Sequence, residues 1–429
     1  MLVNLENQFI ILFFFIFSIF SCVKEDTTIP SIIINKPLSN DSFQIPTNIN
    51  IVGSTWDDNN IDRIEIDVVS ENSAAIIQKI ELNADTNYFE FNISFSLIDR
   101  LINSDNYFIN VKSFDENDNF NSEYVTVYIN EVPKILQSTY YIISTNNLTN
   151  LYEIDSLNNL HLKCQKPGKY NISIGNSRHQ YLFIGTDEIG ESVEPLFYTS
   201  LWDLSLGTSL SYNFTGVLKS DDGNQLFVGY EDGRIFTINK DGNIINSIYS
   251  NNQDFFGEFF VDKDLVLVES KTNSLDKKLV VFFKQSGIEK QRINISGTVK
   301  KILPKGNHQY IVAYNFYGTA KLNIYYENSN SMTTELEIPN CEIYDVIILN
   351  NNNILIASSN GLYNFNLSVN LMSTISTSHF CNKIVKGEQN QDIYLICGNE
   401  LWSYNSSGSL NLVNTVFDSI RDYIPFYNK

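Results

Sequence analysis

A strand motif that recurs seven times after residue 138 constrains this chain more than any other feature. Each copy has a short apolar strand, a gap, and a second strand that usually reads apolar-aromatic-polar-apolar-polar. The first strands end near Ser144, Gly185, Gly229, Glu269, Ala313, Ala357 and Cys397. The second strands are clearest at 151–155, 201–205, 235–239, 362–366 and 401–405. A strand repeat at intervals of about 40–45 residues predicts one small sheet per copy.

Two further apolar stretches complete most copies. One lies about ten residues upstream of the first strand, as at 255–261, and the other follows the aromatic strand, as at 243–249. Four strands in about 40–45 residues is the size of one β-propeller blade. We therefore expect an all-β chain in which residues 137–429 form a seven-bladed β-propeller.

The two ends of this region predict how the ring closes. The first copy lacks the upstream apolar stretch and starts directly at 139–144, the second of the four strands of a blade. The chain finishes with a spare apolar strand at 419–426. That last strand falls where the innermost strand of an eighth copy would begin. We expect it to complete the first blade, because closure removes exposed strand edges.

Residues 31–132 predict a separate β-sandwich, with short alternating strands and turn signals over about 100 residues. An acid-rich turn at 56–60 precedes an Ile-x-x-Ile strand at 61–64, and a later strand ends in Asp115 before an Asn-containing turn. These stretches resemble the bacterial Ig-like domains that act as spacers in surface proteins. The resemblance implies an Ig-like fold, and Pro133 marks the junction to the repeats.

The first residues predict an export signal. The apolar run 9–20 is too short for the roughly 30 Å bilayer core and fits a signal peptide over 1–21. Ile19-Phe20-Ser21-Cys22 resembles the bacterial lipobox, which implies a lipid on Cys22 and a membrane anchor. A polar tether at 22–30 begins Val23-Lys24-Glu25-Asp26, which resembles the surface-export signal of Bacteroidetes lipoproteins and implies an outer-membrane, surface-facing location. A plainly cleaved signal and an uncleaved anchor remain alternatives.

Charge and residue spacing exclude several classes of function. The formal net charge of -20 repels phosphate backbones, so we expect no nucleic-acid partner. No two of the four histidines share metal-ligand spacing, and no Ser-His-Asp or Cys-His arrangement is apparent. We expect no cofactor beyond the lipid. A calcium site using Asp57, Asp58 and Asp115 remains an alternative to a simple polar turn.

The repeats themselves resemble known propellers. The copy at 226–236 is similar to quinoprotein repeats, and the copy at 354–363 is similar to the repeats of sensor-kinase propellers. Quinone enzymes carry a Trp near the end of each repeat, whereas this chain has three Trp in all. The resemblance therefore implies fold and not activity.

The residues that break the repeat predict where a ligand binds. Glu231 and Asp232 fall between the second and the third of the four strands of their blade, and Asp254 leads into the innermost strand of the next blade. These two classes of loop share the face on which propellers usually bind ligands. The aromatic candidates for contacts on this face are Phe255, Phe256, Phe316 and Tyr317. Solvated loop acids and aromatic packing between blades are the structural alternatives.

The cysteines of the mature chain predict free thiols. Cys381 and Cys397 flank a hairpin, but residue 382 lies opposite 397, so Cys381 is one residue out of register. A bridge would need a bulge there. The remaining two, Cys164 and Cys341, have no partner suggested by spacing.

The sequence thus favours a lipid-anchored binding or scaffold protein whose propeller face recognises a protein or glycan. One alternative is a propeller hydrolase or lyase that uses the loop carboxylates. Another is an extracytoplasmic sensor subunit.

Overall fold

The computed structural model describes residues 27–72, 76–145, 147–204, 213–250, 254–272, 276–389, 392–405 and 408–429. Cys22 and the expected signal peptide lie outside these ranges. The described chain is nearly all β, with a single 3-10 turn at Glu327–Ser329, and none of its segments is a helix long and apolar enough to cross a membrane. It divides into two compact units, Met1–Pro133 and Lys134–Lys429.

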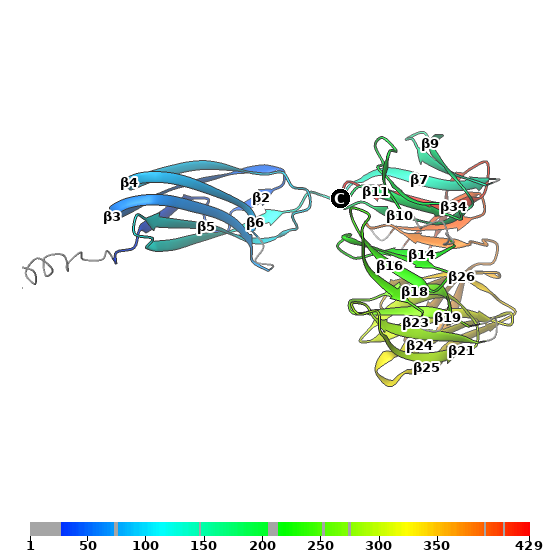
Figure 1. Ribbon diagram of the computed structural model, residues 1–429. Coiled ribbons are helices and arrows are strands. Elements are labelled where there is room, and N and C mark those ends of the chain that lie inside the picture. Colours follow the sequence, from blue (N-terminus) through cyan, green and yellow to red (C-terminus); the bar gives the residue numbers. More distant parts are fainter. Residues whose placement is uncertain are drawn as a thin grey trace, which may run out of the picture. The chain divides into compact units, whose positions relative to one another are not determined.

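The first unit is built on one long hairpin (Figure 1), formed by β3 (Thr47–Ser70) and β4 (Ile76–Leu97). The first half of β3 pairs with β1 (Ser31–Lys36), and its second half pairs with β5 (Asp105–Asp115). The order continues through β6 (Phe120–Asn130) to β2 (Ser42–Gln44), which pairs in parallel. The register of β3 shifts between Trp56 and Ile61, and on either side of this shift β3 pairs with β1 and with β5.

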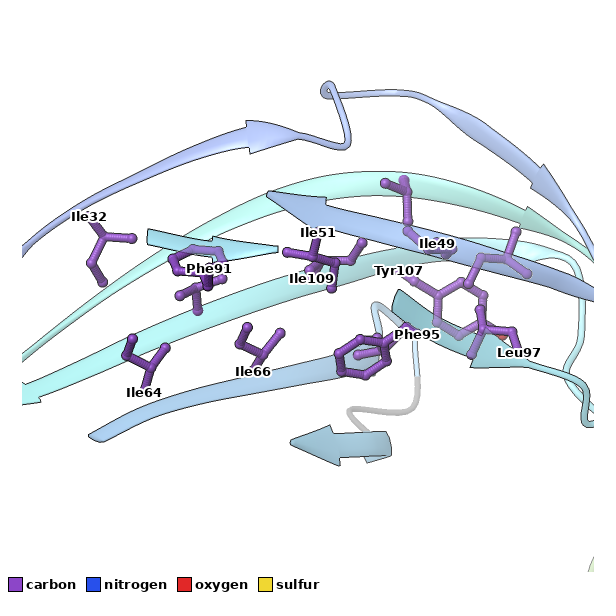
Figure 2. Packing of buried hydrophobic residues seen from close by; sticks show 14 of the residues in the cluster. Ile32, Ile49, Ile51, Ile64, Ile66, Phe91, Phe95, Leu97, Tyr107 and Ile109 are labelled. Carbon is purple, nitrogen blue, oxygen red and sulfur yellow. The ribbon is translucent and has the colours of Figure 1, made fainter. Parts of the chain in front are cut away.

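The core of this unit follows from alternation along these strands. Ile49 and Ile51 in the first half of β3, and Ile64 and Ile66 in its second half, are fully buried. Figure 2 shows these side chains gathered with the ring of Phe95 among the strands. Residues two apart point to the same side of a strand, so each half of β3 contributes one apolar face to a common core.

The described part of the second unit forms seven four-stranded sheets, and the strands of each are named in order from the inner to the outer one. Sheet 1 is β34 (Ile420–Tyr427), β7 (Leu136–Thr145), β8 (Leu148–Ile154) and β9 (Leu160–Pro167); sheet 2 is β10 (Tyr170–Asn176), β11 (Tyr181–Thr186), β12 (Gly190–Val193) and β13 (Ser200–Asp203). Sheet 3 is β14 (Phe214–Lys219), β15 (Gln225–Tyr230), β16 (Arg234–Asn239) and β17 (Ile244–Tyr249); sheet 4 is β18 (Phe255–Val261), β19 (Leu265–Lys271), β20 (Lys277–Phe283) and β21 (Glu289–Ile295). Sheet 5 is β22 (Thr298–Gly306), β23 (Gln309–Phe316), β24 (Thr319–Tyr326) and β25 (Ser331–Pro339); sheet 6 is β26 (Ile343–Asn350), β27 (Asn353–Ser358), β28 (Gly361–Asn366) and β29 (Leu371–Ser376). Sheet 7 is β30 (Lys383–Lys386), β31 (Ile393–Cys397), β32 (Glu400–Tyr404) and β33 (Leu410–Thr415).

The inner strands form a closed cycle. Each contacts the inner strand of the next sheet, from β10 through β14, β18, β22, β26 and β30 to β34, and β34 contacts β10 again. The last strand, β34, also pairs with β7, which places Tyr423 opposite Tyr141. This is the pairing expected for the spare strand at 419–426. The second unit is therefore a β-propeller whose first sheet is completed by the C-terminal strand.

The structure corrects one strand of the repeat. The motif at 201–205 predicts a third strand, but Ser200–Asp203 is the outermost strand β13, and the third strand of sheet 2 is β12. Strand β12 has four residues, and its sequence, Gly190-Glu191-Ser192-Val193, contains one large apolar side chain. A strand this short carries too little alternation to be recognised.

The structure also corrects the state of two cysteines. Cys381 and Cys397 form a disulfide, whereas Cys164 and Cys341 are free. The chain bends at Asn382 before β30 begins, and this bend brings Cys381 beside Cys397 despite the offset register.

Loss of this disulfide should destabilise the propeller. The bridge joins residues 16 apart in sequence, for which loop-closure entropy gives about 2–4 kcal/mol. Urea unfolding of Cys397→Ser should show a loss of that size, and a reductant should lower the midpoint of the wild type but not of the variant. A wild-type midpoint that is insensitive to complete reduction would contradict this prediction.

Candidate functional site

The loops of the propeller fall into two sets at opposite ends of the sheets. Neighbouring strands are antiparallel, so the loop between second and third strands lies at the same end as the connection from each outer strand to the next inner strand. We name this end face A. The opposite end, face B, carries the loops between first and second strands and between third and fourth strands. The sequence candidates Glu231, Asp232 and Asp254 all belong to face A.

Two of these acids already have partners within sheet 3. The guanidinium of Arg234 donates to Asp232 from Nε at 2.8 Å and from Nη2 at 2.5 Å, and Arg234 is itself buried. Glu231 is exposed and accepts a hydrogen bond of 3.2 Å from Asn213 Nδ2. Asp232 is thus tied to its own hairpin, whereas Glu231 faces solvent.

Asp254 has a structural position in sheet 4. It is buried, and its carboxylate accepts hydrogen bonds of 2.9 Å from the hydroxyls of Ser270 and Thr272. Its backbone N–H donates to Ser250 Oγ at 2.8 Å. These bonds join the start of the inner strand to the end of β19, so the carboxylate holds the loop rather than facing a ligand.

The aromatic candidates split into buried and exposed members. Phe256 is 1% exposed and packs edge-on against Phe282, whereas Phe255 is 51% exposed. Phe316 is half-buried, and its ring lies 4.6 Å from that of Tyr317, which is 83% exposed. Alternation along a strand accounts for the first pair, since neighbouring residues face opposite sides.

Tyr317 has an unusual backbone conformation. It and Gly318 form the two-residue turn between β23 and β24, with φ of 45° and 73°. A turn with positive φ at both central residues is favourable for Asn-Gly and unfavourable for a residue as bulky as Tyr. The chain therefore holds a large exposed ring on face A in a conformation that costs free energy.

The calcium candidates lie near one another in the first unit, but Asp115 is already occupied. Asn60 Nδ2 donates to Glu116 Oε1 at 2.9 Å, which brings the bend after Asp57 and Asp58 beside the turn after β5. Asp115 is buried, and its carboxylate accepts three N–H bonds of 2.8 Å from the turn that follows it. Its oxygens therefore stabilise that turn.

The two remaining calcium candidates sit together at the bend. Burial raises the pKa of Asp57, and the adjacent Asp58 raises it further. Thr28 Oγ1 donates to Asp58 Oδ1 at 2.5 Å. Within the described ranges, no group of three or more His, Cys, Asp or Glu side chains is placed to hold a metal ion.

The centre of the propeller carries a polar network that the sequence did not reveal. Lys383 Nζ lies 2.7 Å from Asp422 Oδ1, and Tyr170 OH donates to Asp422 Oδ2 at 2.9 Å. Ser173 Oγ donates to the same oxygen. These residues stand on the inner strands of sheets 7, 1 and 2, so one carboxylate ties three sheets together.

The network continues through the other inner strands. Asp345 accepts hydrogen bonds of 2.8 Å from the backbone N–H groups of Val346 and Ile384, which links sheets 6 and 7. Lys301 Nζ lies 3.5 Å from Glu258 Oε1, which links sheets 5 and 4. Burial raises the pKa of Glu258, and the Glu258 charge raises the pKa of Lys301.

A small cavity interrupts this network. It has a volume of about 140 Å³ and is lined by residues of five inner strands, including Gly216, Glu258 and Lys301. On β14 the lining includes Gly216, where a Cβ would lie 3.0 Å from the ring of Phe259 on β18. The cavity therefore lies inside the ring of inner strands, beside the loosest ion pair of the network.

A second ion-pair cluster lies at face B. The carboxylate of Glu388, between β30 and β31, contacts Lys134 Nζ at 2.7 Å and also Lys219 Nζ. Lys219 Nζ donates to Gly175 O at 3.0 Å, and Gln389 Nε2 donates to Lys134 O at 2.7 Å. A loop of sheet 7 thus reaches the inner strand of sheet 3 and the segment that leads into sheet 1.

Comparisons with known proteins identify no family for this chain. No protein-family model matches it, and no curated protein does. Among solved structures it is similar to the computationally designed Ika8 protein, at 10% identity and a TM-score of 0.47 over 66% of this chain and 89% of that one. It is also similar to a chain of the Mitotic Checkpoint Complex, at 13% identity and a TM-score of 0.45 over 59% and 77%. A third is the β-propeller domain of Cps50 (Swd1) from Myceliophteria thermophila, at 9% identity and 0.43 over 61% and 88%.

Neutralising Glu388 should weaken the propeller in a pH-dependent way. Burial alone would raise the pKa of Glu388, but Lys219 and Lys134 outweigh it and hold the pKa below its usual value. A lowered pKa contributes stability that is present above the unfolded-state pKa and is lost as the pH falls through the folded-state value. Urea unfolding should show that Glu388→Gln is less stable by about 1–2 kcal/mol at neutral pH. This loss lies between those typical of exposed and of buried ion pairs.

The same comparison in acid supplies the check. The difference between wild type and Glu388→Gln should shrink as the pH falls below the usual Glu pKa. The exposed carboxylate of Glu342 on face A is the matched control, since Glu342→Gln should change stability little at any pH. A difference for Glu388→Gln that persists in acid would assign its effect to packing instead of charge.

Proposed function

We propose that this chain is a lipid-anchored protein of the cell envelope that binds a protein partner through face A of its propeller. In this proposal the seven sheets are the seven blades of one ring, and the first unit is an Ig-like spacer. The pairing of β1 with the first half of β3, and of β5 and β6 with its second half, supports the Ig-like assignment. The lipid at Cys22 and the surface-facing, outer-membrane location rest on the leader sequence.

The observation that carries the binding role is the set of exposed aromatic rings on face A. In addition to Phe255 and Tyr317, Phe380 is 56% exposed and Phe417 is 68% exposed. The four come from loops of sheets 4 to 7 and the connection to sheet 1. Aromatic side chains are enriched at the cores of protein interfaces, and a spread over several sheets matches a macromolecule better than a small ligand.

The hydrolase or lyase alternative receives less support. It requires loop carboxylates that are available to a substrate. Of the three candidate acids, Asp232 is paired with Arg234 and Asp254 is buried among hydroxyl donors. Glu231 and Asp232 are both exposed, but Asp232 is held by Arg234, and a glycosidase mechanism needs two available carboxyl groups.

Replacing Tyr317 should separate stability from binding. Tyr317→Asn places a residue that favours positive φ in the turn, so the free energy of unfolding should rise by about 0.5–1 kcal/mol. Removal of the exposed ring should lower the yield of partner captured from an envelope extract of the native host by at least about tenfold, the loss typical of a central aromatic contact. Unfolding curves and quantitative capture measure the two effects.

The control for this experiment lies on face B. Phe197 is 73% exposed in the turn between β12 and β13, and Phe197→Ser should leave capture unchanged. Loss of capture in Phe197→Ser together with normal capture in Tyr317→Asn would contradict binding through face A.

The anchor has its own test. Cys22→Ser should move the protein from the membrane fraction to the soluble fraction, because the modified thiol is removed. Ser21→Ala keeps a small residue before the cysteine and should stay in the membrane fraction. Retention of Cys22→Ser on membranes at the wild-type level would refute lipid anchoring.

A further inference from the structure

A groove lies between sheets 6 and 7 at face B, away from the aromatic rings of face A. Its volume is about 630 Å³, within the range of about 300–1,000 Å³ typical of small-molecule sites. One wall comes from the ends of β26, β27 and β28, and the other from β31 and β32. The sequence candidates did not include any residue of this groove.

The lining is rich in amides and includes one phenol. Asn350, Asn353 and Asn364 stand on the wall from sheet 6, and Tyr404 stands on the wall from sheet 7. Tyr394 borders the groove, but its ring packs against Tyr423 between sheets 7 and 1. Each amide carries donors and an acceptor, and the phenol can do both. Among the described lining residues there is one carboxylate and no lysine or arginine. This surface suits a neutral ligand with many hydroxyl groups and not an anionic one.

Asn364 is the residue that most requires a ligand. It shares a face of β28 with Leu362 and pairs across the sheet with Leu355, and both leucines are fully buried between sheets 6 and 7. The side-chain oxygen Oδ1 of Asn364 is buried and has no hydrogen-bond partner within the described part of the protein. Such an orphaned acceptor costs about 1–3 kcal/mol, and a hydroxyl donor in the groove would remove that cost.

Two other amides of the groove are held in place before any ligand arrives. Asn350 Oδ1 accepts a hydrogen bond of 3.0 Å from Asn353 Nδ2, and Asn353 Oδ1 accepts one of 3.1 Å from Asn366 Nδ2. Burial raises the pKa of Tyr404, so its phenol remains a donor at neutral pH. Groups fixed in this way lose little freedom on binding.

We propose that this groove binds a neutral oligosaccharide, with a sugar hydroxyl donating to Asn364 Oδ1. The amides recognise neighbouring hydroxyl groups, and the ring of Tyr404 gives the apolar face of a sugar a surface to pack on. The single carboxylate, Asp392, lies on the exposed rim and repels acidic sugars. This site is distinct from face A and does not depend on a protein partner there.

Calorimetric titration of the full mature chain tests the proposal. The probes are three neutral trisaccharides (cellotriose, maltotriose and xylotriose) and the anionic trigalacturonate. At least one neutral probe should bind at millimolar concentration or below, and trigalacturonate should bind more weakly. Asn364→Leu should weaken binding by at least about tenfold without lowering the melting temperature, because an apolar side chain replaces an unpartnered polar one.

Matched variants keep the result specific. Tyr404→Phe removes one phenol donor while preserving the shape of the wall, and it should also weaken binding. Asn323 has an equally buried, unpartnered Oδ1 outside the groove, so Asn323→Leu should leave sugar binding unchanged. Tyr317→Asn should likewise bind sugar normally, which distinguishes a failure of this proposal from a failure of partner binding at face A.

Three outcomes would overturn the proposal. They are no heat from any neutral trisaccharide, equal binding by wild type and Asn364→Leu, and tighter binding of trigalacturonate than of every neutral probe.

Discussion

The pairing of β34 with β7 is the constraint on which the propeller depends. It joins the two ends of the second unit, so sheet 1 has four strands and the inner strands form a closed cycle. Closure leaves no inner edge open to another chain. It also brings a carboxylate to the centre of the propeller. Asp422 follows a register shift in β34, and its carboxylate pairs with Lys383 and accepts a hydrogen bond from Tyr170. Without β34, the ammonium group of Lys383 would lose its closest partner.

The polar centre has an energetic consequence. Removing a charge from water costs several kcal/mol, and a nearby opposite charge offsets this only when the remaining hydrogen bonds are also made. Asp422 meets this condition, with one lysine and two hydroxyl donors. Glu258 meets it less well, since its ion pair with Lys301 is 3.5 Å long and burial raises its pKa. The small cavity lies beside this second pair.

Much of the fold could be predicted from the sequence, because apolar periodicity determines both strand order and sheet size. The repeat indicated the four-stranded sheets and the spare strand at 419–426, but strand β12 was too short to register. The central network could not be predicted. In most inner strands the residues of the network follow a shift in strand register. The residues at these shifts, such as Asn171, Thr215 and Tyr344, have no side-chain type in common that a sequence pattern could reveal. The loop acids were placed on the correct loops, yet the sequence could not show that Asp232 and Asp254 already have partners.

The two faces differ in the kind of contact that they offer. Face A presents exposed aromatic rings, and at Tyr317 the backbone adopts an unfavourable conformation while the ring stays exposed. Face B presents a formed groove in which Asn350 and Asn353 bond to each other, whereas the buried acceptor of Asn364 has no partner within the described residues. Rings spread over several sheets suit a broad partner, whereas a lined groove between two sheets suits a narrow chain. Because the two proposed sites share no residue, occupation of one would leave the contacts of the other intact.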